Sequence, residues 1–155
     1  MKDDNNNIAD RIILRRAEDS DISSLTELEK ICFSDPWSET SVKAQLDGRC
    51  CLSVAAEYDG VTAGYIFMQC IPPECEIYRV AVRPDLRRSG IGEKILRYAV
   101  SVSVAIGCTD FFLEVRKSNT AAVNLYAKAG FASVAERRNY YKNPVEDAVI
   151  MSMKP

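Results

Sequence analysis

The chain has 155 residues, of which 47% are hydrophobic and 27% are charged, and its formal net charge is -2. This length suits one domain with a substantial core, and the composition excludes the collagen-like, wholly disordered and membrane-embedded classes. A charge this close to zero gives no global field that would attract nucleic acid, so we expect no direct nucleic-acid partner.

The absence of histidine narrows the chemistry further. It removes Ser-His-Asp and Cys-His nucleophile systems and the HExxH metal helices, so any catalysis must use carboxylates, tyrosine, lysine, an unassisted thiol or the backbone. The six cysteines contain no CxxC pair, which argues against a four-thiolate zinc site. We therefore expect no metal, and we interpret the thiols as small apolar side chains.

The N-terminus, MKDDNNNIAD, is acidic and rich in amides. It contains no apolar run of the kind found in signal peptides or membrane spans. We expect residues 1–10 to form a disordered tail and residues 11–155 to form a single domain, with no membrane association. Without a secretion signal, reduced thiols in the cytoplasm are the simpler expectation.

The first half of the domain predicts a strand, two helices and a hairpin. The capping cluster Glu18–Asp21 precedes apolar residues at helical spacing, and Pro36 ends that helix. Asp59-Gly60 lies between two runs rich in β-branched and aromatic residues, which is a strong hairpin signal. The predicted elements are a strand at 12–15, a helix at 22–32, a short helix capped by Ser38, and strands at 51–58 and 61–69.

The second half alternates strands with helices. The run from Phe111 to Val115 is nearly continuous in apolar residues, as expected for a strand buried on both faces. Gly107 and Gly130 are typical residues to follow a helix. The predicted elements are a strand at 77–82, a helix at 95–106, a strand at 111–115, a helix at 121–129, and strands at 131–135 and 148–153. The order β-α-α-β-β-β-α-β-α-β-β predicts an α/β fold with a mixed sheet of about seven strands flanked by helices.

The segment RVAVRPDLRRSGIGEKIL, from Arg79 to Leu96, places a glycine-bearing loop between a strand and a helix. This arrangement presents free backbone N–H groups and a positive helix end to an anion. The loop lacks GK[ST] and has Ile95 where a dinucleotide fingerprint needs its third glycine, so neither common nucleotide motif is present. What remains, Arg87-x-x-Gly90-x-Gly92, is either a diphosphate site or only a helix N-terminus with a basic turn.

Several polar and aromatic residues also have two interpretations. Glu114 interrupts an apolar strand, where it is either a functional carboxylate or a paired charge at the strand end. Tyr126 taken alone is a core or groove aromatic. Trp37 is either a packing plug between two short helices or part of a substrate mouth. The block RRNYY is either a solvated strand end with a turn or a binding segment.

These motifs together resemble a known family. The loop after Val80-Ala81-Val82 resembles the acetyl-CoA site, [RQ]-x-x-G-x-[GA], of the GNAT superfamily of N-acetyltransferases. The blocks FSDPWSE, FLEVRKSNTAAVNLYAKAGF and RRNYYKNPVEDAVIMSM are similar to those of the bacterial ribosomal-protein-alanine N-acetyltransferases, the RimI type. The predicted element order also matches the GNAT fold over almost the whole chain.

The resemblance implies direct acetyl transfer from acetyl-CoA to the N-terminal alanine of a small-subunit ribosomal protein. Glu114 would be the general base, acting directly or through water, and Tyr126 would protonate the leaving thiolate. Asn119 is either a helix N-cap or a contact to the pantetheine arm, or both. The residues implied to bind acetyl-CoA are Val80, Ala81, Val82, Arg87, Arg88, Ser89, Gly90, Ile91, Gly92, Glu93 and Asn119. The residues implied to frame the groove for the peptide N-terminus are Trp37, Tyr140 and Tyr141.

One departure and two alternatives remain. Glu93 stands where the family often has a small or basic residue, and its charge competes with the phosphates, so we expect weaker binding of acetyl-CoA. The first alternative is an acetyltransferase for other protein N-termini, lysines or small amines. The second is a non-catalytic acyl-CoA-binding module, against which the presence of both Glu114 and Tyr126 argues.

Overall fold

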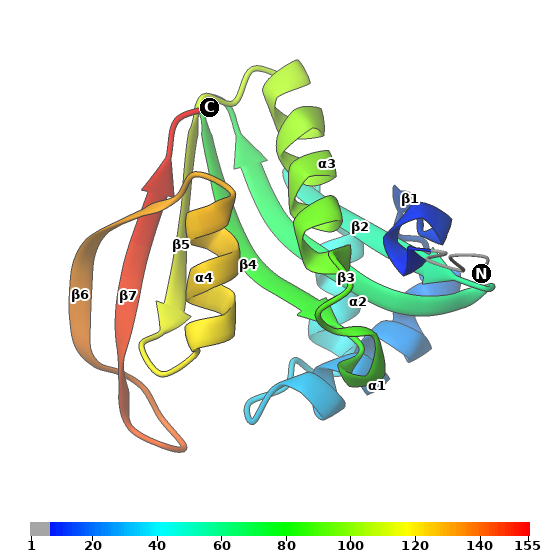
Figure 1. Ribbon diagram of the computed structural model, residues 1–155, viewed down its shortest axis with the longest axis horizontal. Coiled ribbons are helices and arrows are strands. Elements are labelled where there is room, and N and C mark those ends of the chain that lie inside the picture. Colours follow the sequence, from blue (N-terminus) through cyan, green and yellow to red (C-terminus); the bar gives the residue numbers. More distant parts are fainter. Residues whose placement is uncertain (1–6) are drawn as a thin grey trace, which may run out of the picture.

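A computed structural model describes residues 7–155, over which a seven-stranded sheet has helices on both faces (Figure 1). The strand order is β1-β2-β3-β4-β5-β7-β6, and all neighbours are antiparallel except β4 and β5, which are parallel. The strands are β1 (Ile13–Arg16), β2 (Cys51–Tyr58), β3 (Val61–Ile71), β4 (Glu74–Val82), β5 (Asp110–Arg116), β6 (Ala132–Tyr141) and β7 (Glu146–Met153), and the α-helices are α1 (Ile22–Cys32), α2 (Glu39–Asp47), α3 (Ile91–Ala105) and α4 (Thr120–Lys128). The predicted α/β class and the element order are confirmed.

The differences from the predicted elements lie at their ends. α3 begins at Ile91 instead of Ile95, because Gly90 adopts the left-handed conformation (φ 84°) and lets the helix begin directly after the loop. β6 continues to Tyr141 instead of ending at Ala135. This strand is exposed along nearly all of its length and contains two register shifts, so it lacks the alternation that identifies a strand in sequence.

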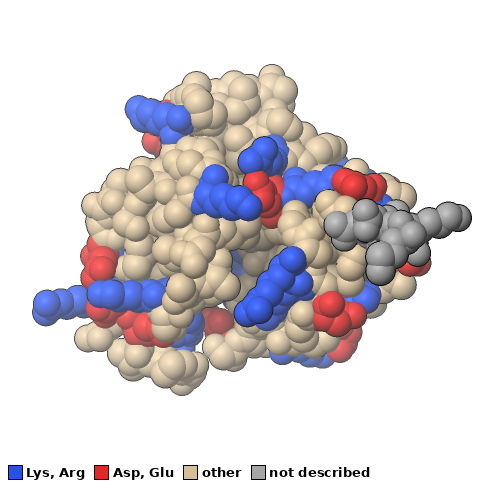
Figure 2. Space-filling view, viewed as in Figure 1, with Lys and Arg blue, Asp and Glu red and all other residues tan. Residues whose placement is uncertain are grey.

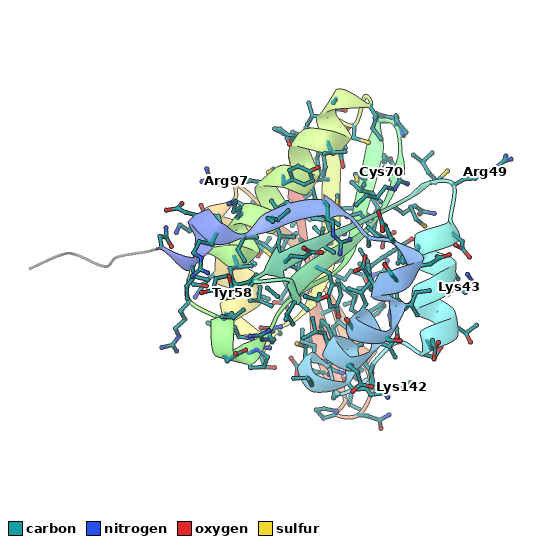
Figure 3. All side chains as sticks on the ribbon, turned by 90° about the vertical axis from the view of Figure 1, so that its right-hand side faces the viewer. Lys43, Arg49, Tyr58, Cys70, Arg97 and Lys142 are labelled. Carbon is teal, nitrogen blue, oxygen red and sulfur yellow. The ribbon has the colours of Figure 1, made fainter. Side chains whose placement is uncertain are left out.

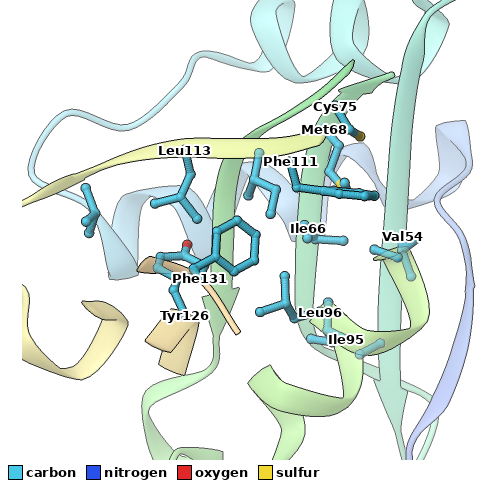
Figure 4. Packing of buried hydrophobic residues seen from close by; sticks show 14 of the residues in the cluster. Val54, Ile66, Met68, Cys75, Ile95, Leu96, Phe111, Leu113, Tyr126 and Phe131 are labelled. Carbon is cyan, nitrogen blue, oxygen red and sulfur yellow. The ribbon is translucent and has the colours of Figure 1, made fainter. Parts of the chain in front are cut away.

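The sheet separates two hydrophobic clusters. Ile66 and Met68 of β3 point into the larger cluster with residues of α3 and α4, whereas Tyr65 and Phe67 point to the opposite face and pack with residues of α1 and α2. Figure 4 shows the larger cluster from close by, and the side view in Figure 3 shows α1 and α2 away from α3. Both faces of the central strands are therefore covered, as the apolar content of β3 requires.

β5 is buried on one face only. Phe111, Leu113 and Val115 are buried, but the alternate residues Phe112 and Glu114 are half-buried. The prediction that this strand is buried on both faces is wrong, because a cavity opens over its second face, where Glu114 and Arg116 line it. Glu114 thus needs no buried partner to be tolerated.

β4 and β5 are paired only near their beginnings. Their register runs from Glu74 opposite Asp110 to Ile77 opposite Leu113. After this point β4 stays paired with β3, β5 stays paired with β7, and the two strands diverge (Figure 1). Each strand therefore presents an open edge to the space between them.

The N-terminal segment is ordered over part of the predicted tail. Residues 1–6 lie outside the described residues, but Ile8–Arg11 forms a 3-10 helix, η1, and Ile8 packs against the larger cluster. The Lys94 ammonium donates to the Ala9 carbonyl oxygen at 2.6 Å, which ties η1 to the first turn of α3. The prediction of a disordered tail as far as residue 10 is therefore wrong for this segment, because Ile8 has apolar surface to cover and Lys94 bonds the backbone.

Three cysteines distant in sequence meet inside the core. Cys70 and Cys75 are cross-strand neighbours in β3 and β4, and the Sγ atoms of both lie within 4.8 Å of Cys108. All three thiols are free and buried among apolar side chains. This environment agrees with the interpretation of these thiols as small apolar residues.

The surface carries both signs of charge. Figure 2 shows basic and acidic side chains intermixed on the face that it presents, without a broad patch of one sign. Across the described residues, none of the helices is both long and apolar enough for a membrane crossing.

Gly64 permits the close approach of β3 to the end of β4. A Cβ at Gly64 would lie 2.5 Å from the Ala81 carbonyl oxygen and 3.0 Å from Cδ1 of Ile95. Because the first of these atoms belongs to the backbone, we expect Gly64→Ala to lower the free energy of unfolding by about 1–3 kcal/mol, measured by urea denaturation.

Gly48→Ala is the matched control for this substitution. A Cβ at Gly48 would also meet an atom at 2.5 Å, but this atom is the Sγ of Cys51, on a side chain that can rotate away. We therefore expect a clearly smaller loss of stability. Equal losses in the two variants would contradict the account of Gly64.

Candidate active site

A cavity of about 240 Å³ lies where β4 and β5 diverge. Its walls come from the α1–α2 loop, the middle of β4, the end of β5, α4 and the end of β6. Seven of the residues singled out from the sequence line it: Trp37, Val80, Glu114, Asn119, Tyr126, Tyr140 and Tyr141. The tertiary structure thus gathers into one cavity side chains that are spread over more than half of the chain.

Glu114 lies on the open face of β5. Its side chain is 20% exposed, and its Oε1 atom lies 3.4 Å from Nη1 of Arg137 on β6. Arg137 is itself 56% exposed, so solvent screens this pair. Glu114 is therefore a carboxylate that solvent and a ligand in the cavity can both reach, with a positive charge beside it.

Glu76 is a second carboxylate in the cavity, and the sequence reasoning missed it. Burial, and next the nearby charge of Glu114, raise the pKa of Glu76, while Arg137 opposes this rise. Glu76 lies just before the predicted strand at 77–82, whereas β4 begins at Glu74, so the signal that singled out Glu114, a charge inside an apolar strand, was missing here.

Tyr126 projects from α4 toward the same cavity. Its ring is buried and lies 5.8 Å from the ring of Phe131, and Figure 4 shows the two side by side near Leu113. Burial, and next the neighbouring Tyr141, raise the pKa of the Tyr126 hydroxyl above its usual value. Tyr126 therefore stays protonated and can act as a hydrogen-bond and proton donor.

Two tyrosines of β6 form another wall. The rings of Tyr140 and Tyr141 meet edge to face at 5.0 Å, and the Arg116 guanidinium lies 4.5 Å from the centre of the Tyr141 ring. A hydrogen-bonding interaction with Glu114, together with burial, raises the pKa of Tyr140, and burial raises the pKa of Tyr141 to about 12. Both hydroxyls are neutral donors near neutral pH.

Trp37 both packs against the core and lines the cavity, the two roles considered for it from the sequence. Its ring stacks on Phe67 at 5.3 Å with an angle of 16° between the planes, so it packs on the smaller cluster. It also lines the cavity, next to Arg79 of β4. Arg79 and the buried Glu29 of α1 beneath it are further residues that the sequence reasoning missed.

Asn119 is the N-cap of α4. Its Oδ1 atom accepts a hydrogen bond from the Ala122 N–H at 3.1 Å. This confirms the capping interpretation. Because Asn119 also lines the cavity, its amide group remains available to a ligand there.

The basic loop lies beside this cavity, at the end of β4, and does not line it. Gly90 has φ 84° and Arg88 has φ 63°, so the loop turns sharply into α3. The first N–H groups of α3 have no partners within the helix, and a Cβ at Gly92 would lie 3.2 Å from Leu125. The absence of side chains at the two glycines leaves a backbone cradle at a helix N-terminus, which fits a diphosphate.

The two arginines of the loop differ in their surroundings. The Arg87 Nε donates to the Val82 carbonyl oxygen at 3.1 Å, so this side chain fastens the loop to the end of β4. Arg88 is exposed. The Ser89 hydroxyl donates to the Leu86 carbonyl oxygen within the loop. Arg87 is exposed like Arg88, and the binding of phosphate by both arginines stays a prediction.

The backbone of Val80, Ala81 and Val82 forms the open edge of β4. Successive N–H groups of a strand alternate between its two edges, and the Arg83 N–H bonds to the Ala63 carbonyl oxygen of β3. The Val82 N–H therefore faces the opposite edge, toward the diverging β5. A donor at this position can stabilise negative charge on a ligand oxygen.

Glu93, the residue that departs from the family pattern, is paired with two cations. Its carboxylate lies 2.7 Å from Nη2 of Arg97 and 3.1 Å from Nζ of Lys128. A hydrogen bond from Lys128 is the largest cause that lowers the pKa of Glu93, with Arg97 adding to it. These partners reduce the repulsion that Glu93 would exert on a phosphate at the start of α3.

Comparison with known proteins finds similarity over most of the chain. The model of the acetyltransferase (GNAT) family matches residues 22–131. The [ribosomal protein bS18]-alanine N-acetyltransferase of Escherichia coli (strain K12) is 33% identical over 138 residues, which cover 88% of this chain and 93% of that protein.

Two further relatives are similar over most of their length. A putative [ribosomal protein bS18]-alanine N-acetyltransferase of Bacillus subtilis (strain 168) is 33% identical over 132 residues, covering 84% of this chain and 87% of that protein. The crystal structure of the ribosomal-protein-S18-alanine N-acetyltransferase from Escherichia coli matches with a TM-score of 0.86 at 30% identity, covering 92% of this chain and 93% of that one.

Proposed function

We propose that this chain, which belongs to the GNAT family and is thus an acetyl-CoA-dependent N-acetyltransferase, acetylates the N-terminal alanine of a ribosomal protein. The observation that carries the proposal is the cavity between β4 and β5, where Glu114 and Tyr126 meet beside the open edge of β4. The names of the relatives in Escherichia coli and Bacillus subtilis support the choice of acceptor.

The donor would bind along the open edge of β4. Arg88 and the backbone from Ser89 to Gly92 would hold the pyrophosphate of acetyl-CoA, with the dipole of α3 adding attraction for the anion. Val80 and Val82 would hydrogen-bond the pantetheine arm. With the pyrophosphate at the start of α3 and the pantetheine arm along β4, the thioester would reach into the cavity, toward Glu114 and Tyr126.

The acceptor would enter between the α1–α2 loop and β6, lined by Trp37, Tyr140 and Tyr141. An α-amino group has a pKa of roughly 7.7–8.0, so a modest base suffices to free its lone pair near neutral pH. Glu114 would take this proton, directly or through a water molecule, and Glu76 adds negative charge that attracts the ammonium form.

The transfer itself needs no covalent intermediate on the protein. The neutral amine attacks the thioester carbonyl carbon, the Val82 N–H stabilises the oxyanion, and the C–S bond breaks as the new C–N bond is completed. Tyr126 gives its proton to the departing thiolate. Glu114 has by then passed the first proton of the ammonium to solvent, so it can accept the second proton from the nitrogen as the amide forms. The Tyr126 tyrosinate takes a proton back from solvent, which leaves an acetylated peptide, free coenzyme A and one released proton.

A panel of short peptides tests the acceptor. We expect peptides that begin with alanine to release free thiol from acetyl-CoA about 10-fold faster, as kcat/KM, than peptides that begin with leucine, because the cavity is small, at about 240 Å³, and is lined by bulky aromatic side chains. A peptide with a blocked N-terminus and an internal lysine is the control and should give only background release.

The panel also separates the alternatives. Release with the blocked lysine peptide alone would contradict N-terminal acetylation and favour a lysine acetyltransferase. Release with no peptide or small amine, while acetyl-CoA still binds, would favour a non-catalytic acyl-CoA-binding module.

A further inference from the structure

Arg79 contacts three residues in the wall of the cavity. Its guanidinium lies 4.1 Å from the centre of the Phe33 ring and 5.5 Å from that of Trp37, and its Nη2 donates to the Asp35 carbonyl oxygen at 2.8 Å. One side chain of β4 thus holds three residues of the α1–α2 loop, which we call the acceptor wall (residues 33–37).

Arg79 is fixed in turn from beneath. Its Nε lies 3.4 Å from Oε1 of Glu29, a residue of α1 that is fully buried. Among the described residues, neither oxygen of Glu29 completes a hydrogen bond, and the same holds for the nearby buried hydroxyl of Tyr65. Burial raises the pKa of Glu29 to about 7, against the opposing charge of Arg79.

This arrangement is not needed for packing. A buried ion pair gains little stability over apolar side chains of similar volume, because both charges must lose their hydration. Phe33 and Trp37 of the wall already pack on the smaller cluster, to which Tyr65 and Phe67 belong. What the contact of the Arg79 guanidinium with the Glu29 carboxyl supplies, and apolar residues would not, is a fixed direction for the guanidinium fork and the two rings packed on it.

We propose that Arg79, held by the buried carboxylate of Glu29, is a positioning residue that fixes the acceptor wall and thereby sets the affinity for the acceptor peptide. This role rests on the proposed function, since it assigns the wall to the acceptor. Arg79, with a side chain that is 11% exposed, also lines the cavity together with the acidic residues Glu76 and Glu114.

Trp37 provides a direct test, because it is the single tryptophan of the chain. Arg79→Met removes the charge and the fork, and Glu29→Gln removes only the charge of the anchor. In both variants we expect Trp37 fluorescence to become more accessible to the quencher acrylamide than in the wild-type protein. Arg79→Lys keeps the charge without the planar stack and should give an intermediate result.

Kinetics with the best acceptor peptide then separate positioning from catalysis. Loss of a partly buried cation–π and hydrogen-bonded clamp should raise the acceptor KM about 10-fold in Arg79→Met. The value of kcat and the KM for acetyl-CoA should stay within about twofold, because the reacting groups are untouched. In Glu29→Gln we expect the acceptor KM to rise as well, but by a smaller factor than in Arg79→Met.

Two exposed residues provide the controls. The first control is Glu27→Gln, because Glu27 lies on the same helix as Glu29 but is exposed and pairs with Lys30. The second control is Lys43→Met, which removes an exposed cation of α2. Neither substitution should change quenching or KM. Circular dichroism checks that Arg79→Met is folded, and if it is not, Glu29→Gln and Arg79→Lys still decide the question.

The outcomes distinguish this role from the proposed function. Unchanged quenching in both Arg79→Met and Glu29→Gln would overturn the positioning role, whatever the enzyme acetylates. Altered quenching with an unchanged acceptor KM, or with a loss of kcat alone, would also overturn it. If the wild-type protein acetylates no peptide, the proposed acceptor fails, and with it the link from the wall to acceptor affinity.

Discussion

Replacing Glu114 with glutamine is expected to lower kcat by about 10²–10⁴-fold, because the amide keeps the shape of the side chain but cannot accept the proton of the acceptor amine. The KM for acetyl-CoA should change little, since Glu114 lies on β5, away from the basic loop. The half-buried position of Glu114 makes a loss of stability small. Steady-state thiol release with an alanine peptide measures both parameters.

The pH dependence of this variant gives a second readout. Without a base, the reaction depends on the fraction of acceptor that is already neutral, and this fraction rises through roughly pH 7.7–8.0. The rate of Glu114→Gln should therefore rise more steeply with pH than that of the wild-type protein between pH 7 and 9.

Glu136→Gln is the matched control for Glu114→Gln. Glu136 lies on the neighbouring β6, but it is exposed and pairs with Lys117. It should retain wild-type kcat. A kcat within twofold of wild type in Glu114→Gln would contradict the assignment and would make Glu76, the other carboxylate of the cavity, the next base to test.

Tyr126→Phe is expected to lower kcat by about 10²-fold, because the departing thiolate loses its proton donor. The ring remains, so its packing against Phe131 and the large cluster should be kept. We expect the thermal midpoint and the KM for acetyl-CoA to stay near the wild-type values. Because burial raises the pKa of the hydroxyl, no loss of activity from ionised Tyr126 should be seen below pH 9.

Tyr98→Phe serves as the control, since Tyr98 lies on the exposed side of α3. Tyr98→Phe should have the kcat, the KM for acetyl-CoA and the thermal midpoint of the wild-type protein. If Tyr126→Phe retained full kcat, the thiolate would have to take its proton from solvent, and Tyr126 would then serve only to pack α4 against β5.

The family and the fold followed from the sequence, and comparison with known proteins confirms them. The reason is that local patterns specify them. Gly90 and Gly92 mark the loop and the start of α3, Asp59-Gly60 marks a hairpin, and helical spacing marks α1. Glu114 and Tyr126 were singled out by residue type and motif, and the structure brings them to one cavity.

Other features depend on contacts between distant segments. Whether β5 is covered on one face or two depends on where the helices pack, so the apolar run from Phe111 to Val115 was not sufficient to predict it. β6 is exposed along nearly all of its length, so its sequence does not alternate between apolar and polar residues. The strand was therefore predicted too short. The hydrogen bond from Arg87 to the Val82 carbonyl oxygen depends on how the loop folds back on β4.

The sequence by itself determined the fold and the basic loop, because each has a local signature, whereas the roles predicted for Glu114 and Tyr126 came from the family resemblance. Only the tertiary structure decided which residues surround them. Parallel β4 and β5 diverge after Ile77, which opens the cavity, and the contacts of Glu29 with Arg79 and of Arg79 with Trp37 join an α-helix, a strand and a loop. No spacing in the chain encodes such contacts, since they form only when separate elements pack on the same sheet.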